Sequence, residues 1–576
     1  MRHSEMMIDT LKKYINTFLD SPSKLIWFYI ILNMIPSIFL IFTEPINIYG
    51  KIILITFPLG LYIILFSLMR NTGLIQLILF PLLIIHAFQL VVFYLFGEDV
   101  IAVDMFLNVV TTNPSEAGEL LNSLWPSIIF VCILYIPTTV IAIYQMKYKT
   151  YLENTLRKKL VVMGGILIIA SYILSLLSKD NNTDRYTFHE NVYPVNVFYN
   201  LNFAINKWHK SRLYPVTSKD FTFEARKDTI AKQREIYTLV IGETSRAENW
   251  SLYGYERETT PLLKQKEGLV FFNDAITQSN TTHKSVSIMM SAASAENYNI
   301  IYEQKSIIEA FKEVGFTTIF LSNQGANNTF TQYFAEDADY YRNIRSPKDD
   351  GKIIDNYDDA LLPLLDHCID SISGNLFIIL HTYGSHFNYE ERYPKGFSKF
   401  KPDNVKEITR KEKEKLVNAY DNTILYTDDF LSRITDILNN SGSCSSMLFA
   451  SDHGEDILDD DRMRFLHASP NPTFYQLRIP MLVWFSSNYQ MNFQQKYEAA
   501  KANKLKPVST NAIFHTLLDI ASVKTNYLQS DLSLVNPSFK IAKRMYLGDH
   551  DNPVFFYNAN LKEEDKIMIE KRKIYH

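Results

Sequence analysis

The chain has 576 residues and a formal net charge of -4, and its first third is markedly more apolar and aromatic than the rest. A chain of this length exceeds one ordinary domain, so we expect at least two parts. The small net charge, with no basic cluster and no nucleic-acid motif, argues against nucleic acid as a partner, whereas the apolar first third favours a membrane.

Five apolar segments in the first third are long enough to cross a bilayer, and none of them contains Lys, Arg, Asp or Glu. They cover residues 25–42, 52–69, 74–96, 128–144 and 160–177. The first segment starts too late and is too long for a cleaved signal peptide, so we expect it to remain as an anchor. Residues 1–178 are therefore predicted to form a transmembrane domain of five helices. Within the third segment, His86 and Gln89 are expected to pack or hydrogen-bond between helices.

Lys and Arg are distributed unevenly between the predicted loops. The N-terminal segment and the fourth loop carry Arg2, Lys12, Lys13 and Lys24, and Lys147, Lys149, Arg157, Lys158 and Lys159. The long third loop, residues 97–125, has five acidic residues and no Lys or Arg. Because basic loops stay in the cytoplasm, we expect a cytoplasmic N-terminus and an exported region after residue 177.

Residues 179–232 are predicted to link the membrane domain to the exported one. Over residues 193–215, aromatic side chains alternate with Asn, Lys and Arg. This pattern fits an interfacial segment on the membrane surface, and it fits equally an amphipathic linker packed on the next domain. Cys132 falls inside the fourth apolar segment, so Cys368 and Cys444 allow at most one exported disulfide.

Residues 233–576 alternate short β-rich apolar runs with helical stretches, which predicts an α/β domain with a largely parallel central sheet. Four of the runs end in polar groups: "IYTLVIGETSR", "FTTIFLSNQG", "NLFIILHTYGSH" and "SSMLFASDHGED". In open α/β sheets, ligands bind beyond the carboxyl ends of the strands. The four polar strand ends therefore predict one shared site.

The residues at these ends that can bind a metal are Glu243, His386, Asp452 and His453, and His467 follows in the next loop. Carboxylates and imidazoles together are a suitable ligand set for zinc. Each residue alone has an ordinary explanation as a helix cap, a turn or a surface loop residue. Their joint occurrence at successive strand ends favours a metal site.

The segment "QSNTTHKSVSIMMS", residues 278–291, places hydroxyl groups before a run that begins a helix. Ser, Thr and Asn cap helix N-termini, which is one explanation of the pattern. The other explanation is a catalytic hydroxyl, because a hydroxyl beside a metal loses its proton easily and can attack phosphorus.

The sequence resembles the bacterial phosphoethanolamine transferases of the alkaline phosphatase and sulfatase superfamily over nearly its whole length. The segments "VIGETSRAENWSLYGYERETTP" and "ASDHGE" carry the resemblance, which implies that Glu243, Asp452 and His453 are zinc ligands. The distance to Ser285-Val286 and Met289 makes Thr282 the implied nucleophile. Thr281 is then left to cap the helix or to pack beside the metal.

Further residues match positions of the family that contact substrate. His386 and His467 correspond to residues that hold the phosphate or a second zinc, and Gln324 to an amide near that phosphate. In the third loop, "NVVTTNPSEAGELL" resembles the segment that binds the donor headgroup, and its matching polar positions are Asn108, Thr112 and Glu116. A spacing of four places these three on one helix face, where Glu116 is suited to pair with an ammonium group.

The resemblance implies a multi-pass enzyme of the bacterial inner membrane with its catalytic domain in the periplasm. Such an enzyme transfers phosphoethanolamine from phosphatidylethanolamine to lipopolysaccharide, at a core sugar or at lipid A, through a zinc-activated phospho-threonine. Members that act on lipid A often have cysteines beside the nucleophile, whereas this chain has Ser279, Asn280 and Ile288. That departure leans towards a core sugar as acceptor.

Three alternatives stay open at this point. A phosphodiesterase or other hydrolase of the same superfamily passes the group to water, and a phosphoglycerol transferase builds a surface polymer. A membrane-anchored sensor or assembly protein keeps the fold without the chemistry. A sulfatase activity is disfavoured, because the Cys/Ser-x-Pro-x-Arg setting of its nucleophile is missing.

Overall fold

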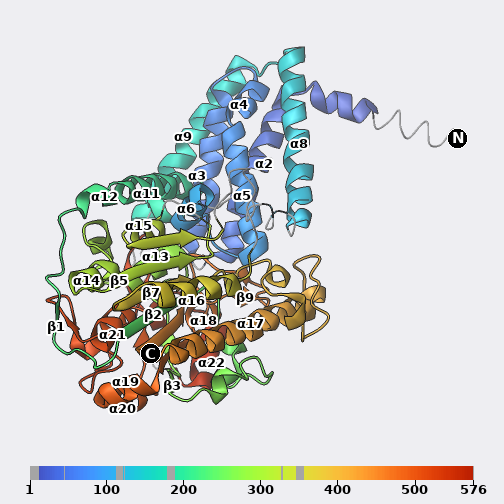
Figure 1. Cartoon of the computed structure of the whole chain (residues 1–576). Helices are drawn as coiled ribbons and strands as arrows, with labels where there is room; N and C mark the ends of the chain where they lie inside the picture. The colour runs from blue at the N-terminus through green and yellow to red at the C-terminus, as the bar shows by residue number, and fades with distance from the viewer. Residues whose placement is uncertain are drawn as a thin grey trace. The chain divides into compact units, whose positions relative to one another are not determined.

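The computed structural model describes residues 12–44, 46–111, 118, 121, 124–177, 188–325, 329–345 and 356–574. The chain divides into two compact units. The helical unit comprises Met1–Phe106 and Leu124–Phe203, and the α/β unit comprises Leu107–Ser123 and Ala204–His576. Figure 1 shows the first as helices coloured blue to cyan and the second as mixed helices and strands. The predicted domain limits at residues 178 and 232 stay predictions.

Among the described residues of the helical unit, four single helices are long and apolar enough to cross a membrane. They are α2 (Pro22–Thr43), α3 (Ile48–Ser67), α8 (Trp125–Tyr148) and α9 (Asn154–Leu177). The third predicted segment is not one helix, because α4 (Thr72–Ile78) and α5 (Phe80–Phe96) meet at a bend of 63°. Pro81 lies in the first turn of α5 and has no backbone N–H, so it cannot donate a helical hydrogen bond to the carbonyl of Leu77. The expected five spans are therefore four helices and one bent pair.

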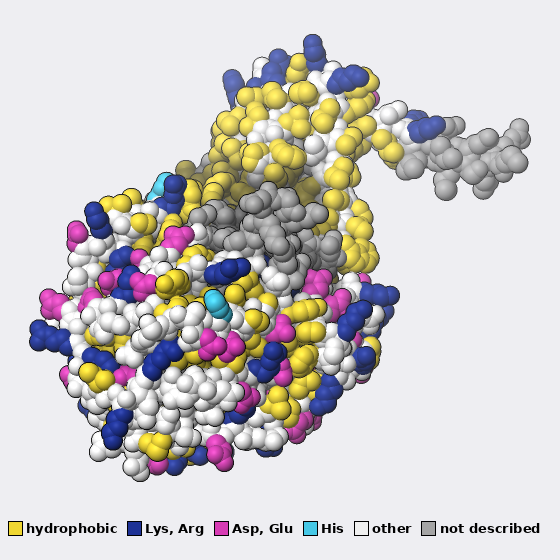
Figure 2. All heavy atoms as spheres, in the orientation of Figure 1, with side chains coloured by type: hydrophobic (Ala, Val, Ile, Leu, Met, Phe, Trp, Pro, Cys, Tyr) yellow, Lys and Arg dark blue, Asp and Glu magenta, His cyan; other side chains and the backbone are white. Residues whose placement is uncertain are grey.

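The surface of these helices is apolar. Phe42 is 81% exposed and Ile133 69% exposed, and many other large apolar side chains of the same helices are also open. On the face drawn in Figure 2, apolar side chains cover most of the helical unit and Lys and Arg gather at one end of it. A surface of this kind fits a hydrocarbon environment with a basic flank.

His86 and Gln89 of the third segment are buried and hydrogen-bonded, as expected. The His86 ring lies 3.1 Å from the Tyr62 hydroxyl on α3 and 2.5 Å from the Tyr193 hydroxyl, which follows α10 (Phe188–Asn191). Gln89 donates to the carbonyl of Asp99 at 2.8 Å and accepts from the amide of Ile101 at 3.1 Å. Both residues therefore join α5 to neighbouring segments of the same unit.

Shorter helices flank the apolar ones in the sequence. Helix α6 (Val103–Thr111) lies between α5 and α8, and helices α11 (Val195–Arg212) and α12 (Tyr214–Thr217) lie between α9 and the first strand. The segment predicted to lie on the membrane surface forms α11 for most of its length. Its location relative to a membrane stays a prediction.

The described part of the α/β unit is built on a seven-stranded sheet. Its strands, in spatial order, are β3 (Leu269–Phe271), β11 (Met481–Phe485), β8 (Cys444–Ser451), β2 (Glu235–Gly242), β7 (Leu376–His381), β5 (Thr317–Ser322) and β6 (Tyr340–Asn343). The five strands from β8 to β6 are parallel, while β11 is antiparallel to β8 and β3. The predicted largely parallel sheet is confirmed.

Short two-stranded ladders accompany the sheet: β1 (Arg226–Lys227) with β13 (Val523–Lys524), β4 (Ala275–Ile276) with β12 (Val508–Ser509), β9 (Asp456–Ile457) with β10 (Phe465–Leu466), and β14 (Met545–Leu547) with β15 (Pro553–Phe555). The further helices described in this unit are α13 (Thr282–Met290), α14 (Ile307–Glu313), α15 (Phe330–Glu336), α16 (Leu362–Ser371), α17 (Lys413–Asn440), α18 (Phe474–Leu477), α19 (Ser487–Asn492), α20 (Gln494–Asn503), α21 (Ala512–Ile520) and α22 (Glu563–Arg572).

The core of the unit lies against the central strand. Alternate residues of β2, namely Tyr237, Leu239 and Ile241, join a buried cluster with side chains of α13, α14 and α21. Side chains alternate across a strand, so the other residues of β2 face the opposite side of the sheet. Cys368 and Cys444 are both free thiols, so the allowed disulfide does not form.

Candidate metal and phosphoryl site

Three of the predicted ligands meet at the carboxyl ends of two neighbouring parallel strands. Glu243 follows β2, and Asp452 and His453 follow β8, which is its direct partner in the sheet. One ligand atom from each side chain lies within 4.8 Å of the others, and all three residues are buried. The strand ends therefore bring together an acid-acid-imidazole group that can hold a metal ion.

Local backbone geometry fixes this group. Thr244 has a left-handed φ of 59°, which turns the chain directly after Glu243. Its amide donates to Asp452 Oδ1 at 3.0 Å, and the His453 amide donates to the same oxygen at 2.7 Å. The Thr244 hydroxyl donates to Glu243 Oε1 at 2.7 Å. These hydrogen bonds orient both carboxylates.

The remaining atoms of the group fit a cation. His453 Nδ1 donates to the carbonyl of Gly454 at 2.9 Å, so Nε2 presents its lone pair. That nitrogen lies 3.2 Å from Asp452 Oδ2 and 3.5 Å from Glu243 Oε1. Asp452 Oδ2 is buried and has no hydrogen-bond partner among the described residues. Burial lowers the pKa of His453 to about 4, which keeps the ring neutral and able to bind a metal.

The hydroxyl of Thr282 faces the same group. Thr282 is the first residue of α13, and its Oγ1 lies 3.2 Å from His453 Nε2 and 3.3 and 3.4 Å from the two oxygens of Glu243. Thr281 occupies the N-cap position, but its side chain makes no capping hydrogen bond. Its hydroxyl lies instead 3.2 Å from the hydroxyl of Ser279. Of the two threonines, Thr282 is the one whose hydroxyl contacts the predicted ligands.

The two other predicted histidines, His386 and His467, lie near each other, and His467 lies beside His453. The ring of His467 is 4.1 Å from that of His453, and the ring of His386 is 6.3 Å from that of His467. His386 Nδ1 donates to the carbonyl of Phe387 at 2.7 Å. Burial, together with the charges of Arg392 and His467, holds the pKa of His386 well below its usual range.

Sequence reasoning missed the residues that orient His467. Glu455 Oε1 lies 3.0 Å from His467 Nδ1, and the Tyr389 hydroxyl donates to the other oxygen of Glu455. Burial raises the pKa of the Glu455 carboxyl to about 8. Glu455 stands two residues after His453 in "SDHGED", so the sequence could have indicated it as a residue of the site. Tyr389 had no signal in the sequence.

Of the other residues predicted to contact substrate, Gln324 lies at the site, while the third-loop residues are only partly within the described chain. Gln324 Nε2 donates to Glu243 Oε2 at 3.0 Å and to the carbonyl of Thr382 at 2.8 Å, so its amide directly contacts a predicted ligand. Asn108 lies in α6 and is half-buried. Thr112 and Glu116 lie outside the described residues, so the predicted headgroup face stays a prediction.

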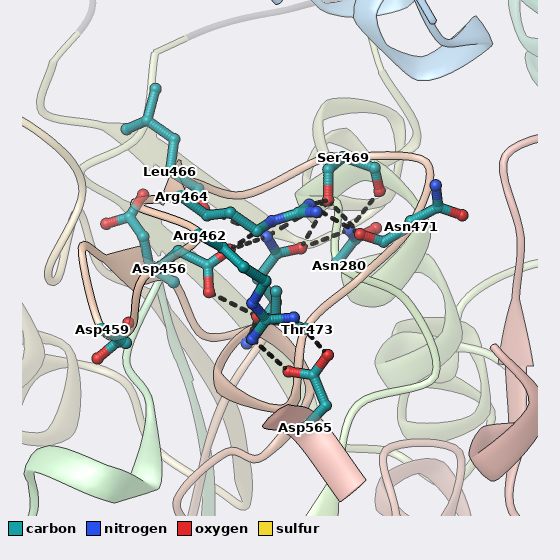
Figure 3. A network of polar contacts seen from close by, with 12 residues as sticks. Asn280, Asp456, Asp459, Arg462, Arg464, Leu466, Ser469, Asn471, Thr473 and Asp565 are labelled. Atoms are coloured by element: carbon teal, nitrogen blue, oxygen red, sulfur yellow. Dashed lines mark hydrogen bonds and ion pairs between the residues drawn. The ribbon is translucent and has the colours of Figure 1, made fainter. Parts of the chain in front are cut away.

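The loop that carries His467 is held by buried polar contacts (Figure 3). Asp456 accepts hydrogen bonds from Thr473 at 2.6 Å and Gln476 at 2.7 Å, and lies 3.4 Å from Arg464 Nε. Arg462 binds Asp565 on α22 with two hydrogen bonds of 2.7 and 2.9 Å.

The same loop is fastened to the segment that precedes Thr282. Asn280 Nδ2 donates to the carbonyl of Ser469 at 2.9 Å and to Gln476 Oε1 at 2.7 Å, and Asn280 Oδ1 accepts from the Tyr546 hydroxyl at 2.8 Å. The Asn280 side chain therefore links the loop that carries His467 to the segment that leads into Thr282.

Two family models match the chain. The model described as sulfatase matches residues 236–523, and the model described as phosphoethanolamine transferase EptA/EptB matches residues 59–206. The expected resemblance to the bacterial phosphoethanolamine transferases is thereby confirmed.

Relatives of known name agree with these models. The phosphoethanolamine transferase EptA of Escherichia coli K12 is 32% identical over 310 residues, which are 52% of this chain and 55% of that protein. The Kdo(2)-lipid A phosphoethanolamine 7''-transferase of the same organism is 30% identical over 283 residues, 48% of each chain. The chain thus matches about half the length of these relatives.

Solved structures show the same fold. The integral membrane lipooligosaccharide phosphoethanolamine transferase A of Neisseria meningitidis superposes with a TM-score of 0.67 at 22% identity, over 88% of this chain and 98% of that one. The periplasmic domain of EptC from Escherichia coli, solved in complex with zinc, superposes with a TM-score of 0.53 at 25% identity, over 60% of this chain and 97% of that one. With half of its residues matched by the sulfatase model and an EptA/EptB region ahead of it, this chain belongs to the sulfatase family and resembles the phosphoethanolamine transferases within it.

Proposed function

We propose that this protein transfers phosphoethanolamine from phosphatidylethanolamine to lipopolysaccharide. In this proposal, the chain is a multi-pass protein of the bacterial inner membrane, and its α/β unit works in the periplasm. The observation that carries the proposal is the Thr282 hydroxyl, which lies 3.2 to 3.4 Å from His453 and Glu243. The names of the relatives supply the transferred group, because they are phosphoethanolamine transferases.

Zinc fits the donor set of the site. Glu243, Asp452 and His453 would hold it, with Thr282 beside them, and the unpartnered Oδ2 of Asp452 is suited to an ion rather than to a hydrogen bond. When bound, the ion supplies Lewis-acid chemistry, which favours the ionised form of a neighbouring hydroxyl and offsets charge on phosphoryl oxygens.

The reaction proceeds in two displacements at phosphorus. The Thr282 hydroxyl loses its proton as Oγ1 forms a bond to phosphorus, the bond to the glycerol oxygen breaks, and diacylglycerol leaves after taking up a proton. An acceptor hydroxyl, which gives up its proton, or an acceptor phosphate oxygen then attacks the phosphorus, and the bond from phosphorus to Thr282 Oγ1 breaks as that oxygen takes up a proton. His386 and His467 are the two candidates for binding the phosphoryl oxygens and for carrying the proton.

The position of Thr282 assists both steps. It begins α13, and the positive end of the helix dipole stabilises a developing alkoxide and a bound phosphate. Gln324 donates to the Glu243 carboxylate, which limits the rotation of that side chain. The ammonium group of the donor is assigned in this proposal to the loop segment that contains Asn108, Thr112 and Glu116.

Mass spectrometry of the intact enzyme tests the proposal. The full chain, in detergent with zinc, is incubated with phosphatidylethanolamine labelled in its ethanolamine group and then digested. We expect the label on the peptide that contains Thr281 and Thr282, and its loss in Thr282→Ala but not in Thr281→Ala. Label retained in Thr282→Ala, or release of free phosphoethanolamine without any transfer to lipopolysaccharide, would contradict the assignment.

A further inference from the structure

A cavity of about 580 Å³ lies in the α/β unit, within the size range of pockets that bind small molecules. Its described lining residues lie between positions 323 and 403 and include three tyrosines, Tyr357, Tyr383 and Tyr393. The other described residues of the lining are polar or charged, apart from one glycine. None of the residues assigned above to phosphoryl transfer lines it.

Two segments separate this cavity from the predicted metal ligands. Asn323 lines the cavity, while the next residue, Gln324, donates to Glu243. Tyr383 and Gly384 also line it, and the Tyr383 ring stacks on His386 at 5.1 Å. A Cβ added to Gly384, whose φ is 52°, would lie 2.7 Å from the carbonyl oxygen of Glu243. The cavity and Glu243 are therefore separated only by these two short segments.

The inner wall of the cavity is fixed by buried contacts. Asp358 accepts hydrogen bonds from the amides of Tyr383 at 2.8 Å and Gly384 at 2.9 Å, and from Asn323 Nδ2 at 2.8 Å. Arg392 is buried, donates to the carbonyl of His386 at 2.9 Å, and lies 4.3 Å from the centre of the Tyr383 ring. These contacts already order the wall, so little free energy of binding would be lost in fixing its side chains.

The mouth of the cavity is accessible. Among the lining residues, Tyr357 is 40% exposed, and Glu390, Glu391 and Lys395 are exposed as well. An aromatic ring with charged hydrogen-bonding groups around it can hold a ligand that has both an apolar face and a polar edge.

The chemistry of the lining indicates which part of the proposed substrates would bind in the cavity. Among the described lining residues there is no aliphatic side chain, which disfavours an acyl chain. The described lining residues include four carboxylates and two cations, which disfavours a phosphate group. A sugar ring fits, because its hydroxyls both donate to carboxylates and accept from Arg or Lys, while its C–H face packs on an aromatic ring.

We infer that this cavity is a recognition site for a neutral or amine-bearing sugar of the acceptor glycan. The inference rests on the proposed function and adds the part of the acceptor that is recognised. The sugar in the cavity is not the one that reacts, because the segment 383–386 stands between the cavity and Glu243. Binding there contributes affinity and orientation for a neighbouring sugar of the same glycan.

The first experiment separates acceptor recognition from the donor reaction. The full chain and its variants Tyr357→Ala and Tyr357→Phe are assayed for the labelled Thr282 peptide and for transfer to purified lipopolysaccharide free of phosphoethanolamine. We expect Tyr357→Ala to raise the KM for lipopolysaccharide roughly three- to tenfold, as loss of an aromatic contact implies, with label on Thr282 unchanged. Tyr357→Phe keeps the ring and should stay within about twofold of the wild type.

Tyr340→Ala is the matched control, since Tyr340 is 54% exposed on β6 and lies outside the lining. Its KM should equal that of the wild type. An unchanged KM in Tyr357→Ala, or an equal rise in Tyr340→Ala, would overturn the inference. Failure of the wild type to label Thr282 would instead refute the proposed phospho-threonine reaction.

The second experiment tests binding without any reaction. Saturation-transfer NMR is recorded on the full chain with methyl glucoside or methyl glucosaminide, with and without inorganic phosphate, in a detergent without a sugar headgroup. We expect transfer to at least one of the two sugars, no weakening of that signal by phosphate, and loss of the signal in Tyr357→Ala. A sugar signal that persists in Tyr357→Ala or is displaced by phosphate, or no signal from either sugar with the wild type, contradicts the inference whatever the outcome of the transfer assay.

Discussion

The substitution Asp452→Asn should stabilise the metal-free protein and remove most of the stabilisation by zinc. Asp452 Oδ1 accepts two backbone hydrogen bonds, which an asparagine oxygen can keep. The amide nitrogen then replaces Oδ2, the buried oxygen that has no hydrogen-bond partner among the described residues. The change therefore removes one charge from the site and leaves its backbone contacts in place.

The magnitude follows from the distance between the charges. The ligand atoms of Glu243 and Asp452 lie within 4.8 Å of each other. At an effective dielectric constant of about 20, two like charges at that distance repel by about 3 kcal/mol. Without zinc, the variant should unfold at a temperature roughly 5 °C higher than the wild type. With zinc in large excess over its dissociation constant, the wild type should gain about 4 kcal/mol, and the variant far less, because one ligand is lost.

The assay is thermal unfolding of the full chain in detergent at pH 8, with excess zinc or with a chelator. Asp436→Asn is the control, because it removes a carboxylate on α17 whose side chain is 61% exposed. It should change neither the chelated protein nor the zinc increment. A lower unfolding temperature for chelated Asp452→Asn, or a full zinc increment in that variant, would refute the assignment of these carboxylates to a metal.

Three further predictions concern the support of the site and of the fold. Gln324→Ala should lower transfer about 10- to 100-fold, because residues that orient a metal ligand typically contribute that much, and the kcat for transfer measures it. Asp428 accepts from the amides of Leu262 and Leu263 at 2.8 and 2.9 Å, and burial raises the pKa of its carboxyl to about 6. The folded protein then holds this proton more tightly than the unfolded chain, so ionisation of the carboxyl lowers the free energy of unfolding as pH rises from about 4 to 6. Asp428→Asn lacks this ionisation. Relative to the wild type, its free energy of unfolding in denaturant should therefore increase by about 2 kcal/mol between pH 4.5 and 7.5. Arg462→Ala leaves the buried carboxylate of Asp565 without its two hydrogen bonds from that guanidinium and should destabilise the α/β unit by about 3 kcal/mol in the same unfolding assay.

Two of these predictions have a matched control variant. For Gln324→Ala, Gln332→Ala on α15 removes an exposed amide and should leave kcat unchanged. For Arg462→Ala, Arg410→Ala breaks an ion pair with Asp461 whose side chains are 68% and 99% exposed, and should cost less than about 1 kcal/mol. A pH-independent stability difference for Asp428→Asn, or an equal cost for the two arginine variants, would contradict the reasoning.

Motifs at strand ends made much of the site predictable. Glu243, Asp452 and His453 were found because polar residues follow apolar runs directly, and parallel strands place such residues at one edge. Thr282 was chosen over Thr281 from a resemblance, and the structure adds that its hydroxyl is the one that contacts the predicted ligands. The contact of Gln324 with Glu243 was not predictable, since it depends on where two loops far apart in sequence meet.

The sequence by itself determined the apolar segments, the class of the α/β unit and the residue types of the site. These features rest on local hydrophobic patterns and on residues adjacent to strands, which act over a few positions of the chain. The sequence did not indicate that the third apolar segment is divided into α4 and α5, which meet at a bend next to Pro81. Tertiary structure alone decided that Glu455 and Tyr389 orient His467, that Asn280 joins two loops, and that described residues between positions 323 and 403 line one cavity. Contacts of this kind depend on the packing of distant segments, for which no local pattern exists.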